Sequence, residues 1–174
     1  MEACLEFDQV FSEVNLLEIY HGHIAQTSAI GIDRLGREQF EKQLHKQIEV
    51  LSKKACSGTY RFSQYKEKLI SKGAKKFPRE ISIPTYRDRI ALRALCNVLR
   101  DSFDSDLSLK IPQAVIQEIK DCIGTGDYHF FAKLDIEEFY PSINHELLLG
   151  RIKEKVVDEN LLKILTSAVR TPTV

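Results

Sequence analysis

The sequence predicts an α+β protein that is mostly helical and has few strands. Apolar residues recur at helical spacing through much of the first 55 residues and again near the end of the chain. Two short strand-like segments enclose a basic turn between residues 65 and 83, and a third strand-like segment lies at 128–136. Helices in runs, separated by a hairpin and a later strand, are typical of the α+β class. A chain of 174 residues can form one domain or two small lobes that share a core.

The N-terminal part predicts two helices, over residues 6–25 and 37–55. In the second, one face is apolar at intervals of four, four and three residues, and the glycine of Ser57-Gly58 ends the helix. A loop with two glycines joins the helices over residues 27–36. The apolar positions on which these predictions rest are Phe7, Val10, Phe11, Val14, Leu17, Ile24, Phe40, Leu44, Ile48 and Leu51.

The middle of the chain predicts a hairpin followed by a long helix. Residues 65–71 and 80–83 have strand character, and the basic segment Lys72-Gly-Ala-Lys-Lys-Phe-Pro78 forms the turn between them. Pro84 ends the second strand, because proline cannot donate a backbone hydrogen bond to a sheet. Thr85 is then a suitable N-cap for a helix that continues to about Phe103.

The last part of the chain predicts a helix, a strand and two more helices. Residues 112–122 are helical in pattern and are followed by Gly124-Thr-Gly126. Residues 128–136 are rich in aromatic and branched side chains, which favours a buried strand. Residues 145–156 and 159–169 have the pattern of helices.

Charge is unevenly distributed, although the chain has 25 basic and 25 acidic residues. The segment between Ser52 and Arg100 contains thirteen Lys and Arg residues and three acidic residues, so it has a net charge of +10. Such a concentration is typical of a surface that binds phosphate groups. A solvated basic face would explain the charge equally well.

The composition also limits where the protein can act. No run of 18 or more apolar residues occurs, and the acidic N-terminus lacks the order of a signal peptide. The four cysteines are far apart, without a Cys-x-x-Cys pair, which disfavours a zinc site or a disulfide framework. We therefore expect a cytoplasmic protein with no membrane partner.

Asp135 is the candidate catalytic residue, since it follows the predicted strand at the point where that strand ends. A carboxylate on such a rigid element can bind Mg²⁺, which prefers oxygen ligands. A structural role as the N-cap of a short helical turn over residues 137–140 is the alternative, and for an isolated aspartate it is the better one.

The segment Asp135-Ile-Glu-Glu-Phe-Tyr-Pro-Ser-Ile-Asn-His145 resembles the first palm motif of bacterial reverse transcriptases, the group of retron and group II intron enzymes. The resemblance implies that Asp135 binds both catalytic metals and that Ile136 offers a backbone carbonyl to one of them. It also implies that Tyr140 lies under the incoming sugar and excludes a 2′-hydroxyl. His145 is better explained as a hydrogen-bonding residue at a helix start.

The segment Arg79-Glu-Ile-Ser-Ile-Pro-Thr-Tyr-Arg-Asp-Arg-Ile-Ala-Leu-Arg-Ala-Leu95 resembles a second block of the same family, the fingers hairpin and the helix after it. The resemblance implies that Arg79 and a lysine hold the triphosphate of the nucleotide. Lys72 best fits the lysine position, and Lys75 and Lys76 lie at the tip. The remaining expected contacts with nucleic acid are Arg87, Arg89 and Arg93. A local ion pair between Asp88 and Arg89 is an equally good explanation of those two residues.

A weaker third similarity covers Ile30-Gly-Ile-Asp-Arg-Leu-Gly-Arg-Glu-Gln-Phe40, which resembles the stretch before the fingers in non-retroviral members. Together the three similarities imply an incomplete right-hand polymerase. Its predicted parts are an N-terminal helical segment over 1–60, mostly helical fingers with a β-hairpin over 61–127, and the first strand and helices of a palm over 128–174. They imply an RNA-directed DNA polymerase (a nucleotidyltransferase) that uses two Mg²⁺ ions, or Mn²⁺, with an RNA template, a DNA primer and dNTPs.

The sequence also departs from the family. No Asp-Asp dipeptide occurs, so the second catalytic carboxylate motif is missing, and we expect this chain to be inactive alone. A piece of a longer protein is the favoured explanation, and a naturally split protein is the alternative. Similarity to intron enzymes fades between Ser102 and Gly126, which indicates a divergent branch, retron-like or devoted to antiviral defence. We expect self-association through the exposed edge of the palm strand. Two alternatives are a non-catalytic nucleic-acid-binding module and a template-independent polymerase.

Overall fold

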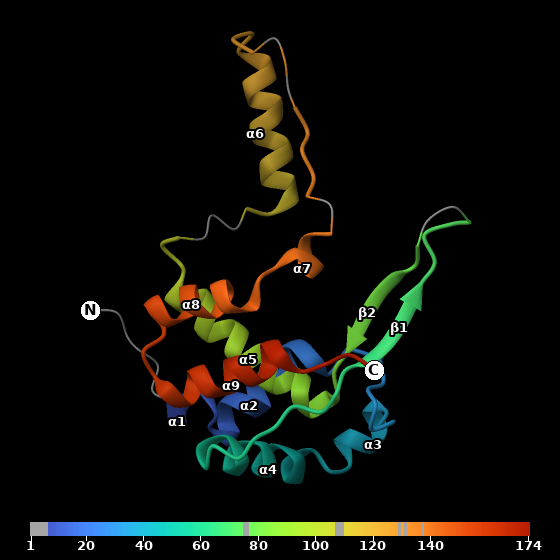
Figure 1. Cartoon of the computed structure of the whole chain (residues 1–174), viewed down its shortest axis with the longest axis vertical. Helices are drawn as coiled ribbons and strands as arrows, with labels where there is room; N and C mark the ends of the chain where they lie inside the picture. Colours follow the sequence, from blue (N-terminus) through green and yellow to red (C-terminus); the bar gives the residue numbers. More distant parts are fainter. Residues whose placement is uncertain (1–6, 75–76, 107–109, 129, 131, 137) are drawn as a thin grey trace.

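The computed structural model describes residues 7–74, 77–106, 110–128, 130, 132–136 and 138–174. In this part of the chain, helices surround one core and a two-stranded antiparallel hairpin projects from it (Figure 1). The predicted α+β class with a mostly helical content and a β-hairpin is therefore confirmed. Lys75 and Lys76, predicted as nucleic-acid contacts, lie outside the described residues.

The N-terminal helices are shorter than predicted. The helix expected over residues 6–25 is divided into α1 (Phe7–Val10), α2 (Glu13–Ile19) and a π-helical turn, η1 (Tyr20–Ile24). Its continuity was predicted wrongly because Ser12 starts a new helix: its side chain accepts a hydrogen bond from the backbone N–H of Asn15 at 3.3 Å.

The helix expected over residues 37–55 is also interrupted, into α3 (Arg37–Glu41) and α4 (Leu44–Cys56). Gln43 leaves the helical conformation, with φ −121° and ψ 15°. The apolar face continues across this break, since Phe40 and Leu44 are both buried.

The hairpin consists of β1 (Lys66–Ile70) and β2 (Arg79–Ile83), close to the predicted bounds. The strands pair in antiparallel register from Lys66 opposite Ile83 to Ile70 opposite Arg79. The end of the chain extends this unit, because Thr173 forms a parallel bridge with Tyr65. The hairpin is thus attached at its base to the C-terminal segment, a contact that the sequence pattern does not reveal.

Helix α5 (Tyr86–Ser102) is the centre of the fold. It packs against α1, α2, η1, α4 and α9. Thr85 caps it as predicted, accepting a hydrogen bond from the backbone N–H of Asp88 at 3.2 Å. Because α5 follows β2 after only Pro84 and Thr85, the packing of this helix determines how the hairpin leaves the core.

Two C-terminal helices, α8 (His145–Lys155) and α9 (Glu159–Arg170), close the core. Asn144 and Asp158 cap them, each accepting hydrogen bonds from two backbone N–H groups. Buried residues of both helices belong to the same apolar cluster as the N-terminal helices, and they are Leu149, Ile152, Leu161, Ile164 and Leu165.

Helix α6 (Pro112–Gly124) projects away from the core as a second arm, and the chain returns from its far end to α7 (Phe139–Ser142) (Figure 1). None of the side chains of α6 is buried. The strand predicted over residues 128–136 is absent from the described residues of that range, which have no regular structure. A strand needs a hydrogen-bonded neighbour, and none of the described segments pairs with this one. Phe130 and Leu134 are consequently 94% and 91% exposed.

Candidate nucleic-acid and nucleotide interface

The hairpin has two faces of opposite charge. Residues that lie opposite one another in an antiparallel pair share a face, and successive residues alternate between faces. The observed register therefore puts Lys66, Lys68 and Arg79 on one face and Glu67 and Glu80 on the other. We call the first the cationic face. It is a surface on which three positive charges can meet phosphate groups together.

The sequence interpretation identified Arg79 and missed the contribution of Lys66 and Lys68. Both lysines precede the basic turn and are exposed, as is the whole of β1. The spacing Lys-x-Lys in a strand places them on one face, but their alignment with Arg79 depends on the register, which the sequence alone does not give.

Lys72 and Arg79 lie on either side of the turn, on exposed backbone at the outer part of the hairpin. Within the part of the chain that the structure describes, neither side chain forms a hydrogen bond or an ion pair. Their charged groups are therefore exposed on the surface, and the role in holding a triphosphate stays a prediction.

Asp88 anchors the base of the hairpin to α5. Only 2% of the residue is exposed, and its carboxylate accepts three hydrogen bonds. Tyr60 Oη donates to Oδ1 at 2.6 Å, while the backbone N–H of Ser63 and Thr85 Oγ1 donate to Oδ2 at 3.2 and 2.7 Å. Burial, then the charge and hydrogen bond of Asp88, raises the pKa of Tyr60 well above its ordinary value.

Arg89 forms no ion pair with Asp88, because each side chain binds other groups. The Nε of Arg89 donates to the carbonyl of Pro84 at 3.1 Å, and its Nη1 donates to Thr27 Oγ1 at 2.9 Å. Its Nη2 donates to the carbonyl of Ala29, and the guanidinium lies 4.6 Å from the ring centroid of Tyr86. Arg89 thus fastens the loop over residues 27–29 to the start of α5.

Arg87 and Arg93 are partly buried on α5. The Nε atom of each is buried without a hydrogen-bond partner among the described residues. Nη2 of Arg93 lies 3.2 Å from His23 Nε2 on η1. Arg89 and Arg93, four residues apart, share a face of α5 that looks toward the loop over residues 27–29 and η1, whereas Arg87, two residues before Arg89, lies on a different side of the helix. The structure therefore does not bring the three arginines together into one surface.

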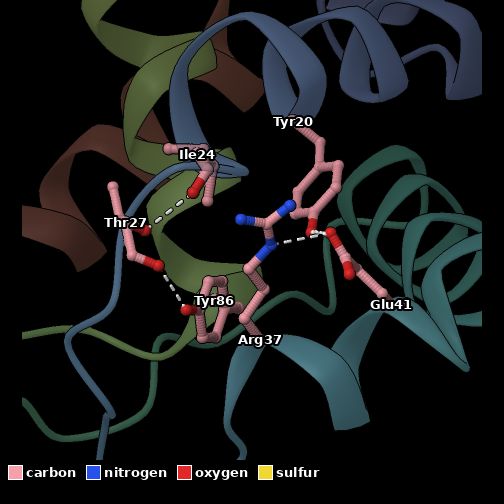
Figure 2. Close-up of polar contacts among 6 residues, drawn as sticks. All are labelled: Tyr20, Ile24, Thr27, Arg37, Glu41 and Tyr86. Atoms are coloured by element: carbon pink, nitrogen blue, oxygen red, sulfur yellow. Dashed lines mark hydrogen bonds and ion pairs between the residues drawn. The ribbon is translucent and has the colours of Figure 1, made fainter.

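The loop before α3 is held by a polar cluster (Figure 2). Tyr86 Oη donates to the carbonyl of Thr27 at 2.6 Å, which attaches the loop to α5. On the other side, Glu41 accepts from Tyr20 Oη at 3.0 Å and from Arg37 Nε at 2.9 Å. Burial, followed by the hydrogen bond to Glu41, raises the pKa of Tyr20 to about 12. The carboxylate of Glu41 balances the positive charge of Arg37 within the protein.

Gly31 explains why a glycine occurs in the third similar segment. A Cβ atom at this position would lie 2.8 Å from Thr85 Cα and 2.9 Å from Thr85 N. The loop therefore touches the backbone at the junction of β2 and α5, and only a residue without a side chain fits.

We expect Gly31→Ala to lower the free energy of unfolding by about 2–3 kcal/mol, because backbone atoms have to move to admit the methyl group. Gly22→Ala is the matched control, since a Cβ atom there meets nothing within 4 Å. Urea unfolding followed by circular dichroism measures both. Equal stability of the two variants would contradict the close contact at Gly31.

Asp135 and Ile136 lie on the exposed chain between α6 and α7, and Tyr140 lies on α7 with 75% of its surface exposed. The structure offers no support for Asp135 as a helix cap. Helix α7 begins after Glu138, which has a left-handed conformation (φ 50°), and among the residues that the structure describes no side chain caps that helix. The residues implied to bind metal are therefore on the second arm, and those implied to bind triphosphate are on the hairpin.

Among the described residues, no group of three or more His, Cys, Asp or Glu side chains is placed to hold a metal ion. The metal-binding role that the sequence similarity implies for Asp135 and Ile136 would require further carboxylates, because two Mg²⁺ ions need more oxygen ligands than these two groups provide. Within the described ranges, no helix combines the length and the apolar character needed to cross a membrane.

The fold and the candidate site define an α+β chain with a cationic β-hairpin anchored on a central helix. No protein-family model matches the chain. The chain is similar to Protein YkfC of Escherichia coli (strain K12), with 20% identity over 152 residues. The alignment covers 80% of this chain but spans 39% of the length of YkfC. This is a distant similarity to a longer protein.

Proposed function

We propose that this chain forms the fingers and the beginning of the palm of an RNA-directed DNA polymerase, similar to bacterial retron and group II intron enzymes. The cationic face of the hairpin is the observation that carries the proposal. It presents Lys66, Lys68 and Arg79 together on an arm whose base is fixed by the buried Asp88. The order of the three similar sequence segments supports the same function.

In this proposal, Arg79 and Lys72 hold the triphosphate of an incoming dNTP. The planar guanidinium of Arg79 can bind two phosphate oxygens, and the lysine adds a mobile positive charge. In the same proposal, Lys66, Lys68 and the arginines Arg87, Arg89 and Arg93 of α5 contact the template or the template–primer backbone. The RNA template, the DNA primer and the dNTP are thus the proposed partners.

Asp135 and the carbonyl of Ile136 would hold Mg²⁺ together with carboxylates from the rest of the palm. The metal ions would stabilise the charge that develops on the attacking and leaving oxygens. Residues of this chain would bind the triphosphate, orient the sugar and position the template. We refer to this chain together with the rest of its palm as the complete polymerase.

The proposal is tested by Arg79→Gln in the complete polymerase. Loss of a charge-assisted contact to phosphate corresponds to about 1.5–3 kcal/mol, so we expect the KM for dNTP to rise by about 10–100-fold. Steady-state primer extension measures it, with Arg100→Gln at the exposed end of α5 as the control. An unchanged KM and kcat for Arg79→Gln would contradict the triphosphate role.

Tyr140 is the proposed steric barrier to ribonucleotides. Tyr140→Val should raise the use of rNTPs relative to dNTPs by about tenfold or more, because the small side chain leaves room for the 2′-hydroxyl. Tyr140→Phe keeps the ring and should keep the selectivity. Single-nucleotide incorporation assays with each nucleotide measure the ratio, and equal selectivity of the two variants would remove this role from Tyr140.

A further inference from the structure

A second basic surface lies on the core, and its residues are different from those of the cationic face of the hairpin. It is a cavity of about 470 Å³ between α8, α9 and the loop that follows α4. We call it the α9 groove. Its lining includes Gly58 and Leu162. The rest of the lining is four cationic residues, Arg61, Lys153, Lys163 and Arg170, and two residues with a hydroxyl group, Thr166 and Ser167.

One face of α9 supplies most of this lining. Lys163, Thr166, Ser167 and Arg170 follow one another at intervals of three, one and three residues, so they lie on the same side of the helix. In the described structure, the hydroxyl groups of Thr166 and Ser167 form no hydrogen bond. Two positive charges therefore flank a pair of hydroxyl donors, which suits the oxygens of phosphate groups.

The positive charge of the α9 groove is only partly balanced. Its lining contains no acidic residue. Glu159 lies 3.9 Å from Lys163, and Glu146 lies 2.6 Å from Arg170, so two of the cations have an exposed acidic neighbour. Nη1 of Arg61 donates to the backbone carbonyls of Gly58 and Tyr60, which orients this guanidinium without neutralising it.

Lys153 forms no ion pair among the described residues, and its neighbour Glu154 binds Arg151 instead. By contrast, a cavity of about 580 Å³ beside the loop before α3 and the first turn of α3 is lined by Arg34 and Arg37 together with Glu38. Arg37 is also bound to Glu41 there (Figure 2). The α9 groove is the more favourable of these two cavities for an anion.

The α9 groove also leads toward the hairpin. Residues 172–174, directly after α9, run parallel to the start of β1: Tyr65 N–H donates to the carbonyl of Pro172 and Glu67 N–H donates to that of Val174, at 2.9 and 2.8 Å. Arg170 is thus two residues from the segment that pairs with the hairpin base. This continuity favours a long anion that can follow both basic surfaces over a small one that fills only the cavity.

We propose that the α9 groove binds the phosphate backbone of a nucleic-acid strand that continues onto the hairpin. Contacts through backbone phosphates do not depend on base sequence. The proposal concerns binding by this chain and does not require polymerase activity, so it can fail or hold independently of the proposed catalytic function.

The test compares two double variants of this chain that each remove two exposed positive charges. Lys153→Gln with Lys163→Gln changes the α9 groove, and Lys42→Gln with Lys46→Gln changes the surface near α3 and α4. Fluorescence anisotropy measures the Kd for a fluorescein-labelled 15-residue oligouridine at several salt concentrations between 50 and 200 mM. Each phosphate contact on a single strand contributes about 0.7 to the slope of log K against log salt concentration.

We expect the groove variant to bind about tenfold more weakly and to lose about 1.4 from the slope, while the control keeps both values. Equal Kd and slope for the two variants, with unchanged circular dichroism, would overturn the proposal.

Inorganic tripolyphosphate is the second probe. Expressed as the concentration of phosphate groups, at least about tenfold more tripolyphosphate than unlabelled oligouridine should be needed to displace the labelled strand, because tripolyphosphate is too short to reach both surfaces. Equal potency per phosphate would show a small-anion site and would also overturn the proposal.

Discussion

Replacing Asp135 with Ala is expected to reduce primer extension by the complete polymerase by at least about a thousandfold. The carboxylate is the proposed ligand of both metal ions, and the ions stabilise charge only in the transition state, so kcat should fall. Because Asp135 is exposed and no described side chain depends on it, the stability of the fold should be unchanged. Extension rates at saturating dNTP measure the effect.

Asp127→Ala is the matched control for this experiment. Asp127 is an exposed aspartate on the same connection, eight residues earlier in the chain. It should retain full extension activity and the same unfolding curve as Asp135→Ala. Full activity of Asp135→Ala would remove the catalytic role of this residue, whatever else the protein binds.

Replacing Asp88 with Ala is expected to lower the free energy of unfolding by about 3 kcal/mol or more. The change leaves the buried hydroxyl groups of Tyr60 and Thr85 without their acceptor, and it also removes the hydrogen bond from the N–H of Ser63. Urea unfolding followed by circular dichroism measures the loss. Asp101→Ala, an exposed aspartate near the end of α5, should change stability by less than about 0.5 kcal/mol.

The Asp88→Ala substitution should destabilise the hairpin as well as the core. Asp88 connects residues 60–63, just before β1, with Thr85, just after β2, so its removal frees both ends of the arm. Faster amide hydrogen exchange in β1 and β2 of Asp88→Ala, relative to Asp101→Ala, is the expected consequence. A stable variant with unchanged exchange would show that Asp88 is not the anchor.

The elements that could be predicted from the sequence are those with strong local signals. Thr85 followed by a long apolar helical pattern predicted α5 and its cap, and Pro84 marked the end of β2 correctly. The breaks after Val10 and at Gln43 were missed, because the apolar pattern continues across both and only the local cap or backbone geometry interrupts the helix.

Features that depend on distant parts of the chain could not be predicted. The segment 128–136 has strong strand character, yet a strand forms only with a partner, and the described chain offers it none. The cationic face depends on the register that aligns Lys66 and Lys68 with Arg79, and the α9 groove depends on the packing of α9 beside Arg61. The regular spacing along α9 was a usable signal for the groove, but the sequence interpretation treated α9 only as a helix.

Primer extension on an RNA template by the complete polymerase decides whether this chain belongs to an RNA-directed DNA polymerase. The reaction contains a DNA primer, four dNTPs and Mg²⁺, and the product is sequenced. We expect DNA complementary to the RNA template, synthesis that stops without template, and no detectable product from Asp135→Ala. Products unrelated to the template would indicate a template-independent polymerase, and absence of product from the intact protein, with nucleic acid still bound, would indicate a binding module; either result would contradict the proposed function.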